Sequence, residues 1–440
     1  MNSVPIASVP SAMAEYVSMT REQIRTDQLA KLRAMMGELI PRNQFYTARF
    51  TAAGITPQIA SLDEFAQRMP MTTKQELVDD QLAHPPYGSA LTYSLDQYTR
   101  YTQTSGTTRK PIRWLDTTAS WNWMITTWDR VFEAAGVTPD DRVLFTFSFG
   151  PFLGFWLAYD SAVKRGCLVL PGGGLGSEAR LRMLLDNEAT VLCCTPTYAI
   201  RLAESARDLK IDLSQSKIRR VIVAGEPGGS IPATRQRITE LWNGARVIDH
   251  HGMTEIGAVS YQSPDRDDWV HIIEASYIAE VIDPATGQPT AKGEVGELVL
   301  TNLGRWGSPL IRYRTGDLVK PIWTEQGDMA LEGGILGRSD DMVVVRSVNV
   351  FPSAVEEVMR SHAEVAEYRV EVVKHRAMNE LRMQVEFAPG CEVAQKLVLQ
   401  IERELHAALS LRVPIEIVPA DALPRFEMKA KRWLQVESEK

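Results

Sequence analysis

Cysteine and long apolar runs are scarce in this chain of 440 residues. It holds 4 cysteines, and no stretch approaches the roughly 18 consecutive apolar residues of a membrane span. Cys193 and Cys194 are adjacent while Cys167 and Cys391 stand apart, a spacing typical of neither a disulfide framework nor a zinc site. Residues 1–16 lack the basic and apolar regions of a secretory signal. We therefore expect a cytoplasmic protein that spans no membrane and binds no zinc.

The chain also lacks an excess of basic residues. Its 48 Lys and Arg stand against 55 Asp and Glu, for a net charge of -7. This balance gives no basic surface for nucleic acid or an anionic membrane, so any anionic ligand must be held locally. Since 44% of the residues are hydrophobic, the chain can bury a sizeable core, and its length favours more than one domain.

The middle of the chain alternates apolar, strand-like runs with amphipathic segments. The runs at 142–145, 167–170, 191–194 and 221–224 each end near glycine or proline. This alternation predicts an α/β domain with a largely parallel sheet. Upstream, apolar residues at helical spacing predict a helix over about 13–39.

The pattern changes near residue 273, where shorter strands separated by turn signals predict a β-rich subdomain. The predicted strands are 278–282, 296–300 and 318–319. Beyond Gly333 and Gly334, a small α+β domain is predicted. Its elements are strands at 368–373, 381–387 and 415–418 and a helix at 393–409. We thus expect a large N-terminal domain over 1–336 with parallel-rich sheets, a hinge near 337–341, and a small mobile α+β domain over 341–440.

A turn-prone loop over residues 101–111 combines hydroxyls, a glycine and two cations. Hydroxyl donors, exposed backbone amides and a flexible cation are what a polyphosphate needs from a loop. The order of residues differs from that of a Walker A loop. By itself, such a Ser/Thr/Gly cluster is more often a solvated turn.

The loop resembles the Ser/Thr-Ser-Gly-Thr-Thr-Gly-Lys-Pro signature of the adenylate-forming superfamily, which includes acyl-CoA synthetases, luciferases and peptide-synthetase adenylation domains. Other signatures of the superfamily follow in the same order along the chain. Arg109 stands where a glycine is usual, which either stiffens the loop or adds a charge near the phosphates. The resemblance implies that the phosphates of ATP contact Thr104, Ser105, Gly106, Thr107, Thr108 and Lys110.

The turn Ala224–Pro227 follows an apolar strand and matches the Gly-Glu-Pro turn of the superfamily. There the turn lies against the adenine, so the resemblance implies that backbone groups of Gly225, Glu226 and Pro227 bind the nucleotide. A plain corner between strand and loop is the alternative interpretation.

The stretch His250–Glu255 follows another strand. Adjacent histidines suggest a metal site, but neighbours on a strand point to opposite faces, which disfavours joint ligation. The stretch resembles the superfamily's Tyr-Gly-x-Thr-Glu motif. The resemblance implies that Thr254 contacts the α-phosphate and that Glu255 holds Mg²⁺, which prefers carboxylate and phosphate oxygens. The remaining nucleotide-binding residues expected here are Gly252, Met253 and His251, which replaces the usual tyrosine and could stack on the base or donate a hydrogen bond.

The run 311–318 resembles the Tyr-Arg-Thr-Gly-Asp motif almost residue for residue. A carboxylate such as Asp317 can accept both ribose hydroxyls, although an Asp after a glycine is also common in β-turns. The resemblance further implies that Arg338 contacts the nucleotide and that Asp340 is the hinge between the domains. Ser347 stands where a glycine usually borders the pantetheine path, so altered thiolation is expected.

The stretch 423–432 resembles the terminal Pro-Arg-x-x-Gly-Lys motif, which makes Lys429 the candidate catalytic lysine. An ammonium on a mobile domain can approach the carboxylate and α-phosphate as negative charge shifts between them. A solvated basic tail is the alternative interpretation. Met428 replaces the usual glycine, and Lys431 is a second, weaker candidate.

Within the superfamily, the chain is most similar to the phenylacetate-CoA ligase branch, whose members activate aryl and arylacetic acids. The short chain, Asn349–Pro352 after the hinge, and Thr190–Ala199 indicate this branch. Aromatic rings in Phe145–Phe152 could sandwich an aromatic acid, or they could belong to the core. The expected substrate-binding residues are Phe147, Phe149, Gly150, Ala224 and Gly252. Phenylacetate, benzoate, hydroxybenzoate and anthranilate all fit this expectation.

The resemblance implies an ATP-dependent aryl-acid:CoA ligase that uses Mg²⁺, forms an aryl-acyl-AMP and then an aryl-CoA thioester, and forms a homodimer. A carrier-protein phosphopantetheine could replace CoA, because both present the same thiol arm. The Gly-rich run 171–176 suggests a dinucleotide-binding reductase instead, but its spacing departs from Gly-x-Gly-x-x-Gly. The departures at Arg109, His251, Ser347 and Met428 suggest a non-catalytic binding protein, which the presence of Lys429, Asp317 and Glu255 disfavours.

Overall fold

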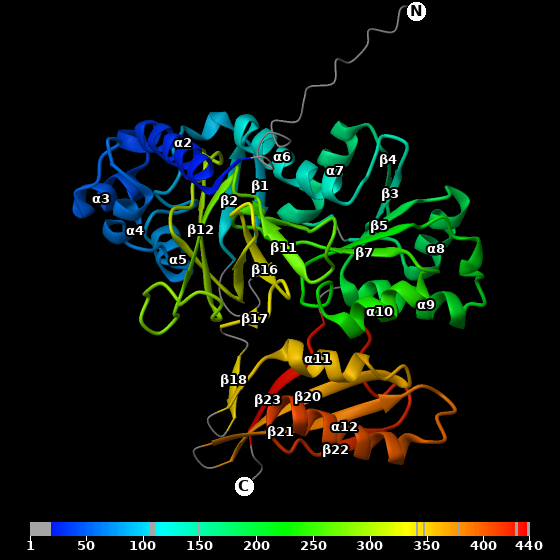
Figure 1. The fold of residues 1–440 in the computed structure, drawn as a ribbon. Coiled ribbons are helices and arrows are strands. Elements are labelled where there is room, and N and C mark those ends of the chain that lie inside the picture. Colours follow the sequence, from blue (N-terminus) through cyan, green and yellow to red (C-terminus); the bar gives the residue numbers. More distant parts are fainter. Residues whose placement is uncertain are drawn as a thin grey trace, which may run out of the picture.

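The computed structural model describes residues 19–104, 111–147, 149–339, 342–345, 348–375, 378–426 and 430–437. A large α/β domain with β-rich sheets lies above a small C-terminal domain in Figure 1. This is the predicted fold class, and it is confirmed. The predicted domain limits and the hinge stay predictions, and Asp340 lies outside the described residues. No helix among the described residues is long and apolar enough to cross a membrane.

The N-terminal part of the large domain is a group of helices that surrounds its own hydrophobic cluster. In α2, Thr20 and Gln23 form a capping box, which fixes the start of the helix at residue 21. The predicted helix over 13–39 is present from residue 21, and its predicted end coincides with a break in helical conformation at Ile40, inside α2. Residues 13–18 lie outside the described ones. The helices are α2 (Arg21–Arg42), α3 (Gln44–Ala53), α4 (Leu62–Arg68) and α5 (Lys74–Ala83).

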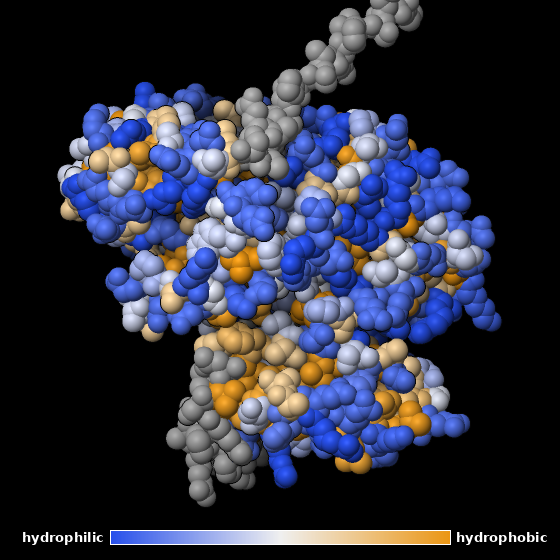
Figure 2. Space-filling model, viewed as in Figure 1, coloured by the Kyte–Doolittle hydropathy of each residue, from blue (hydrophilic) through white to orange (hydrophobic). Residues whose placement is uncertain are grey.

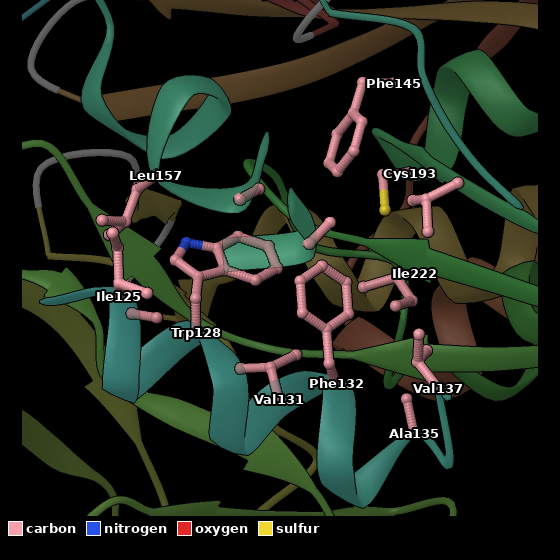
Figure 3. Close-up of a cluster of buried hydrophobic side chains, with 14 of the residues drawn as sticks. Ile125, Trp128, Val131, Phe132, Ala135, Val137, Phe145, Leu157, Cys193 and Ile222 are labelled. Atoms are coloured by element: carbon pink, nitrogen blue, oxygen red, sulfur yellow. The ribbon is translucent and has the colours of Figure 1, made fainter. Parts of the chain in front are cut away.

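The predicted parallel sheet is present and has the strand order β4-β3-β5-β6-β7. It forms one side of the large domain, at the right in Figure 1. Its strands are β3 (Arg142–Phe145), β4 (Leu168–Pro171), β5 (Val191–Cys194), β6 (Arg220–Val223) and β7 (Arg246–Asp249). Successive side chains enter two separate cores, because strand residues alternate between the faces of a sheet. The first core, under α6 (Thr118–Ala134) and α7 (Leu153–Arg165), is shown in Figure 3. The second lies under α8 (Ser177–Asp186), α9 (Pro196–Asp208) and α10 (Pro232–Leu241).

The β-rich region is built from two sheets, with the orders β12-β13-β14-β17 and β10-β11-β16-β15. The predicted strand at 318–319 is only the end of β14 (Tyr313–Val319). Polar residues interrupt the first part of β14, so only its last two residues form an apolar run in the sequence. The other strands are β10 (Ser260–Gln262), β11 (Trp269–Ile272), β12 (Tyr277–Ile282), β13 (Gly296–Asn302), β15 (Pro321–Trp323), β16 (Met329–Glu332) and β17 (Gly337–Arg338).

Two short antiparallel pairs lie next to the predicted ligand-binding motifs. β1 (Tyr98–Gln103) pairs with β2 (Arg113–Thr117) on either side of the predicted phosphate loop. β8 (Gly252–Met253) pairs with β9 (Gly257–Ala258) directly after the two histidines. Both motifs are therefore anchored at their ends by backbone hydrogen bonds.

The small domain contains a sheet with the order β22-β21-β20-β23, covered by α11 and α12. The predicted strands and helix are present as β20 (Val365–His375), β21 (Met378–Phe387), β22 (Ile415–Val418) and α12 (Ala394–Leu409). The sequence interpretation missed α11 (Pro352–Arg360) and β23 (Trp433–Glu437). β23 pairs in parallel with β20, and so fixes the chain just after the predicted catalytic lysine. A short pair, β18 (Val343–Val345) and β19 (Val348–Val350), precedes α11.

The two domains meet where α11 lies beneath α10, as Figure 1 shows. The amide of Ala233 donates to Oε2 of Glu357 at 3.0 Å, and Nη1 of Arg432 lies 3.4 Å from the hydroxyl oxygen of Thr197. On the face drawn in Figure 2 the large domain is mostly hydrophilic, and hydrophobic residues gather on the small domain beside this junction. These two contacts across the junction are polar, which is typical of an interface that can open.

Candidate nucleotide and acyl site

The predicted motifs that the structure describes gather at the carboxyl ends of the parallel strands and on the adjoining β-rich sheet. Ala224–Pro227 follows β6, and His250–Glu255 follows β7. Asp317 lies on β14, which the β14–β17 pairing places opposite Arg338. Open α/β sheets bind ligands at this edge because loops from successive strands meet there.

The Asp317 carboxylate is held by two other predicted nucleotide-binding residues. Nε2 of His251 lies 2.9 Å from its Oδ2, and Nη1 of Arg338 lies 3.2 Å from its Oδ1. Gly316 adopts a φ of +77°, and a Cβ atom there would lie 2.9 Å from Nη2 of Arg338. A glycine is therefore needed for the arginine to lie across the strand. Three stretches far apart in the sequence thus converge on one carboxylate.

A buried ion pair that the sequence interpretation missed supports Thr254 and Glu255. The side chains of Arg305 and Asp116 are both 0% exposed, and their bidentate contacts measure 2.7 and 2.6 Å. Nη1 of Arg305 also donates to the carbonyl oxygens of Glu255 at 2.7 Å and Thr254 at 3.2 Å. Because Asp116 lies on β2, the pair connects the strand after the phosphate loop to the turn that carries Glu255. The sequence signal that could have revealed this ion pair is Arg305 itself, because it is isolated in the otherwise mostly apolar run 302–311.

Glu255 and Asp317 are both close enough to Tyr313 for their charges to act on its buried hydroxyl group. Burial, together with the charges of Glu255 and Asp317, raises the pKa of Tyr313 well above its usual value, while Arg338 opposes this effect. Glu255 itself is nearly buried, and Nζ of Lys74 lies 3.2 Å from its Oε1. The described residues contain no group of three or more potential metal ligands. A single carboxylate fits Mg²⁺ that takes its other ligands from phosphates and water.

The side chain of Glu226 makes contacts that the resemblance did not imply. Its Oε1 accepts a hydrogen bond from the amide of Thr197 at the start of α9, at 3.0 Å. Its Oε2 accepts one from the amide of Ala430 in the small domain, at 2.8 Å. The carboxylate therefore bridges the two domains, and the exposed neighbours Gly225 and Pro227 border it. The expected contact of this turn with adenine stays a prediction.

The aromatic residues predicted to line the acyl pocket pack next to the core under α6 and α7. The ring of Phe149 meets those of Trp156 and Tyr159 edge-on, at centroid distances of 4.9 and 5.6 Å. Phe147 packs against the core cluster. A Cβ atom on Gly173 would lie 2.7 Å from the carbonyl oxygen of Phe147, so this close approach accounts for a glycine in the Gly-rich run without any dinucleotide.

The structure describes some of the remaining predicted site residues and not others. The hydroxyl oxygen of Thr104 accepts a hydrogen bond from the amide of Ile112 at 3.0 Å, which closes the base of the phosphate loop. The carbonyl of Gly150 accepts one from Trp156 at 3.0 Å, Met253 packs against the core of the β-rich region, and Ala224 is half-buried. The predicted residues outside the described ones are Ser105, Gly106, Thr107, Thr108, Lys110, Asp340 and Lys429.

Comparison with known proteins identifies the class to which this fold and site belong. Residues 62–304 match the AMP-binding enzyme family, and residues 347–435 match the AMP-binding enzyme C-terminal domain. The chain belongs to the AMP-binding enzyme family. It is an AMP-forming acid–CoA ligase of the adenylate-forming superfamily, as the sequence motifs predicted.

The predicted similarity to phenylacetate-CoA ligases is also confirmed. The chain is 29% identical over 417 residues to the phenylacetate-coenzyme A ligase of Pseudomonas putida, which covers 93% of each chain. Among solved structures, it is similar to 2-hydroxyisobutyryl-CoA ligase in the postadenylation state with its acyl-AMP, with a TM-score of 0.90 and 27% identity over 95% of this chain and 91% of the other. The same ligase in the thioesterification state gives a TM-score of 0.71 and 27% identity over 96% of this chain and 91% of the other.

Proposed function

We propose that this chain adenylates a small aromatic carboxylic acid with ATP and then transfers the acyl group to CoA. The observation that carries this proposal is the convergence of Asp317, Arg338 and His251 beside Glu255, around the end of the parallel sheet. Similarity to phenylacetate-CoA ligases over 93% of the chain supports an aromatic acid. The rings of Phe147 and Phe149 would flank it.

In this proposal each described residue binds or orients one part of the nucleotide. The carboxylate of Asp317, already oriented by His251 and Arg338, accepts the ribose hydroxyls. Thr254 donates to the α-phosphate, from a turn held in place by Arg305. Glu255 would hold Mg²⁺, which supplies positive charge that neutralises the phosphates. The residues 104–110 would cradle the remaining phosphates through amides and hydroxyls.

Lys429 would stabilise the negative charge that develops as the carboxylate attacks the α-phosphorus. Ala430, the next residue, donates to Glu226 at the end of β6, which supports this assignment because it brings the chain segment to the site. The higher TM-score with the postadenylation state, 0.90 against 0.71, supports an adenylation arrangement of the two domains. Attack by the CoA thiol would then require the small domain to turn about a hinge at 337–341 that includes Asp340.

A pyrophosphate-release assay with ATP and a panel of aryl acids, with and without CoA, tests the proposal. We expect release with at least one acid, and formation of its CoA thioester when CoA is present. Lys429→Ala should lower ATP–pyrophosphate exchange by about 10²- to 10³-fold, the range for loss of one preorganised charge, whereas Lys431→Ala should not. Full exchange in Lys429→Ala would refute the assignment of the lysine. Pyrophosphate release without any CoA thioester would favour a carrier-protein phosphopantetheine as the acceptor.

A further inference from the structure

His250 is a buried polar side chain without a visible partner. The residue is 5% exposed, and neither Nδ1 nor Nε2 has a hydrogen-bond partner among the residues that the structure describes. Burial, with the neighbouring His251, lowers the pKa of His250 to about 3. The ring is therefore neutral at physiological pH, with one N–H donor and one acceptor nitrogen. A buried group with both atoms unsatisfied is destabilising, so its partner is expected to be a ligand.

The strand register places His250 in the predicted acyl pocket. Strand pairing aligns Phe145 with Cys193, Cys193 with Ile222, and Ile222 with Ile248. All of these residues face the core under α6 and α7, and Figure 3 labels Phe145, Cys193 and Ile222 within it. Side chains alternate along a strand, so the residue two positions further on faces the same side.

Two positions beyond Phe145, Ile222 and Ile248 lie Phe147, Ala224 and His250. These three residues form the layer just past the strand ends, where open α/β sheets bind ligands. Contact with α6 supports this placement, because the ring centroid of His250 lies 4.4 Å from that of Trp128. His251 points the other way, towards Asp317, so the layer adjoins the predicted ribose site. Since His250 and His251 are neighbours in the chain, an acyl group joined to AMP would reach from the predicted ribose site to this layer.

We propose that His250 is a specificity residue that hydrogen-bonds a hydroxyl or amino substituent on the acyl group, and that the acid is therefore a hydroxy- or amino-substituted one. The inference rests on the proposed function and narrows its substrate class. A hydroxyl or amino group can both donate and accept, which matches a neutral imidazole. A second carboxylate on the acid would favour an imidazolium, which burial and the adjacent His251 oppose.

Paired acids that differ by one substituent test the inference. The pairs are 4-hydroxyphenylacetate with phenylacetate, anthranilate with benzoate, and 2-hydroxyisobutyrate with isobutyrate. In at least one pair the wild-type chain should prefer the substituted acid by about 10- to 100-fold in kcat/KM, because the analogue that lacks the polar group leaves the buried imidazole unpaired. His250→Leu should bring this ratio close to unity, and His250→Gln should keep part of it.

Two controls separate recognition from a structural effect. Phe147→Leu, in the same layer, should weaken both acids of a pair alike, and His406→Leu, on an exposed face of α12, should change neither. The melting temperature of ligand-free His250→Leu should equal or exceed that of the wild type, because an unsatisfied polar group is removed.

¹⁵N-histidine NMR adds a readout without turnover. In the presence of a non-hydrolysable ATP analogue, the substituted acid should shift the resonances of the His250 ring nitrogens more than its unsubstituted partner does.

The outcomes distinguish this inference from the proposed function. If the wild type uses both acids of every pair equally, or if His250→Leu keeps the wild-type ratio, the role of His250 is overturned and the ligase function stays intact. Failure of every acid to release pyrophosphate with the wild type would overturn the proposed function, and this inference with it.

Discussion

Replacement of Glu226 by alanine should slow adenylation selectively. The carboxylate accepts two hydrogen bonds, from Thr197 at 3.0 Å and from Ala430 at 2.8 Å. The first lies within the large domain and persists in any domain arrangement. The second joins the domains, so only its loss shifts the equilibrium away from the arrangement in which Ala430 of the small domain contacts Glu226.

The size of the effect follows from that one bond. A hydrogen bond to a charged group contributes about 1.5 to 3 kcal/mol, and the half-buried position of Glu226 reduces this to about 1 to 2 kcal/mol. Such a free energy corresponds to a roughly 5- to 30-fold change in an equilibrium constant. We therefore expect ATP–pyrophosphate exchange to fall by about tenfold, within this range, in Glu226→Ala.

Separate assays of the two half-reactions check this prediction. Thioester formation from a supplied acyl-adenylate and CoA should keep its wild-type rate or exceed it, because the small domain leaves its position more readily. Glu178→Ala removes an exposed carboxylate paired with Arg182 on α8, and should leave both half-reactions unchanged. Equal losses in both half-reactions of Glu226→Ala, or undiminished exchange, would refute the reasoning.

Two further predictions concern stability. Arg305→Met should lower the free energy of unfolding by about 3 to 5 kcal/mol in chemical denaturation, since it leaves Asp116 buried and unpaired. The double variant with Asp116→Leu should recover much of this loss. A loss below about 1 kcal/mol in the single variant would contradict the account. Glu356 should make the small domain sensitive to acid: burial would raise its pKa, but Arg432 and Arg360 outweigh burial and lower it to about 2. Because the folded-state value lies below the ordinary one, its contribution to stability is present at neutral pH and is lost as the pH falls from about 4.5 towards about 2. Glu356→Gln should flatten this part of the curve of unfolding free energy against pH, and an unchanged curve would count against the coupling.

Local sequence patterns predicted much of the fold. The central strands were found within one residue of their observed positions, because each is a short apolar run between turn signals, and α12 and β22 were found in the same way. β14 was found only at its end because polar motif residues interrupt its apolar pattern, and β23 was missed although it adds an edge to the sheet of the small domain. In the site, Asp317, Glu255 and His251 were named from motifs, since each motif keeps its residue types at fixed spacing.

The sequence by itself thus determined the strands, the parallel sheet and the motifs, because burial on one face of an element leaves a periodic trace along the chain. Tertiary structure alone decided which polar groups meet. Asp116 and Arg305 lie 189 residues apart, and the contact of Glu226 with Ala430 spans 204 residues. No periodicity records such a pairing, because a hydrogen bond or an ion pair depends on where two distant segments are packed. For the same reason, the buried ring of His250, which has no hydrogen-bond partner among the described residues, could be recognised only once its strand, α6 and the layer that it shares with Phe147 and Ala224 were placed together.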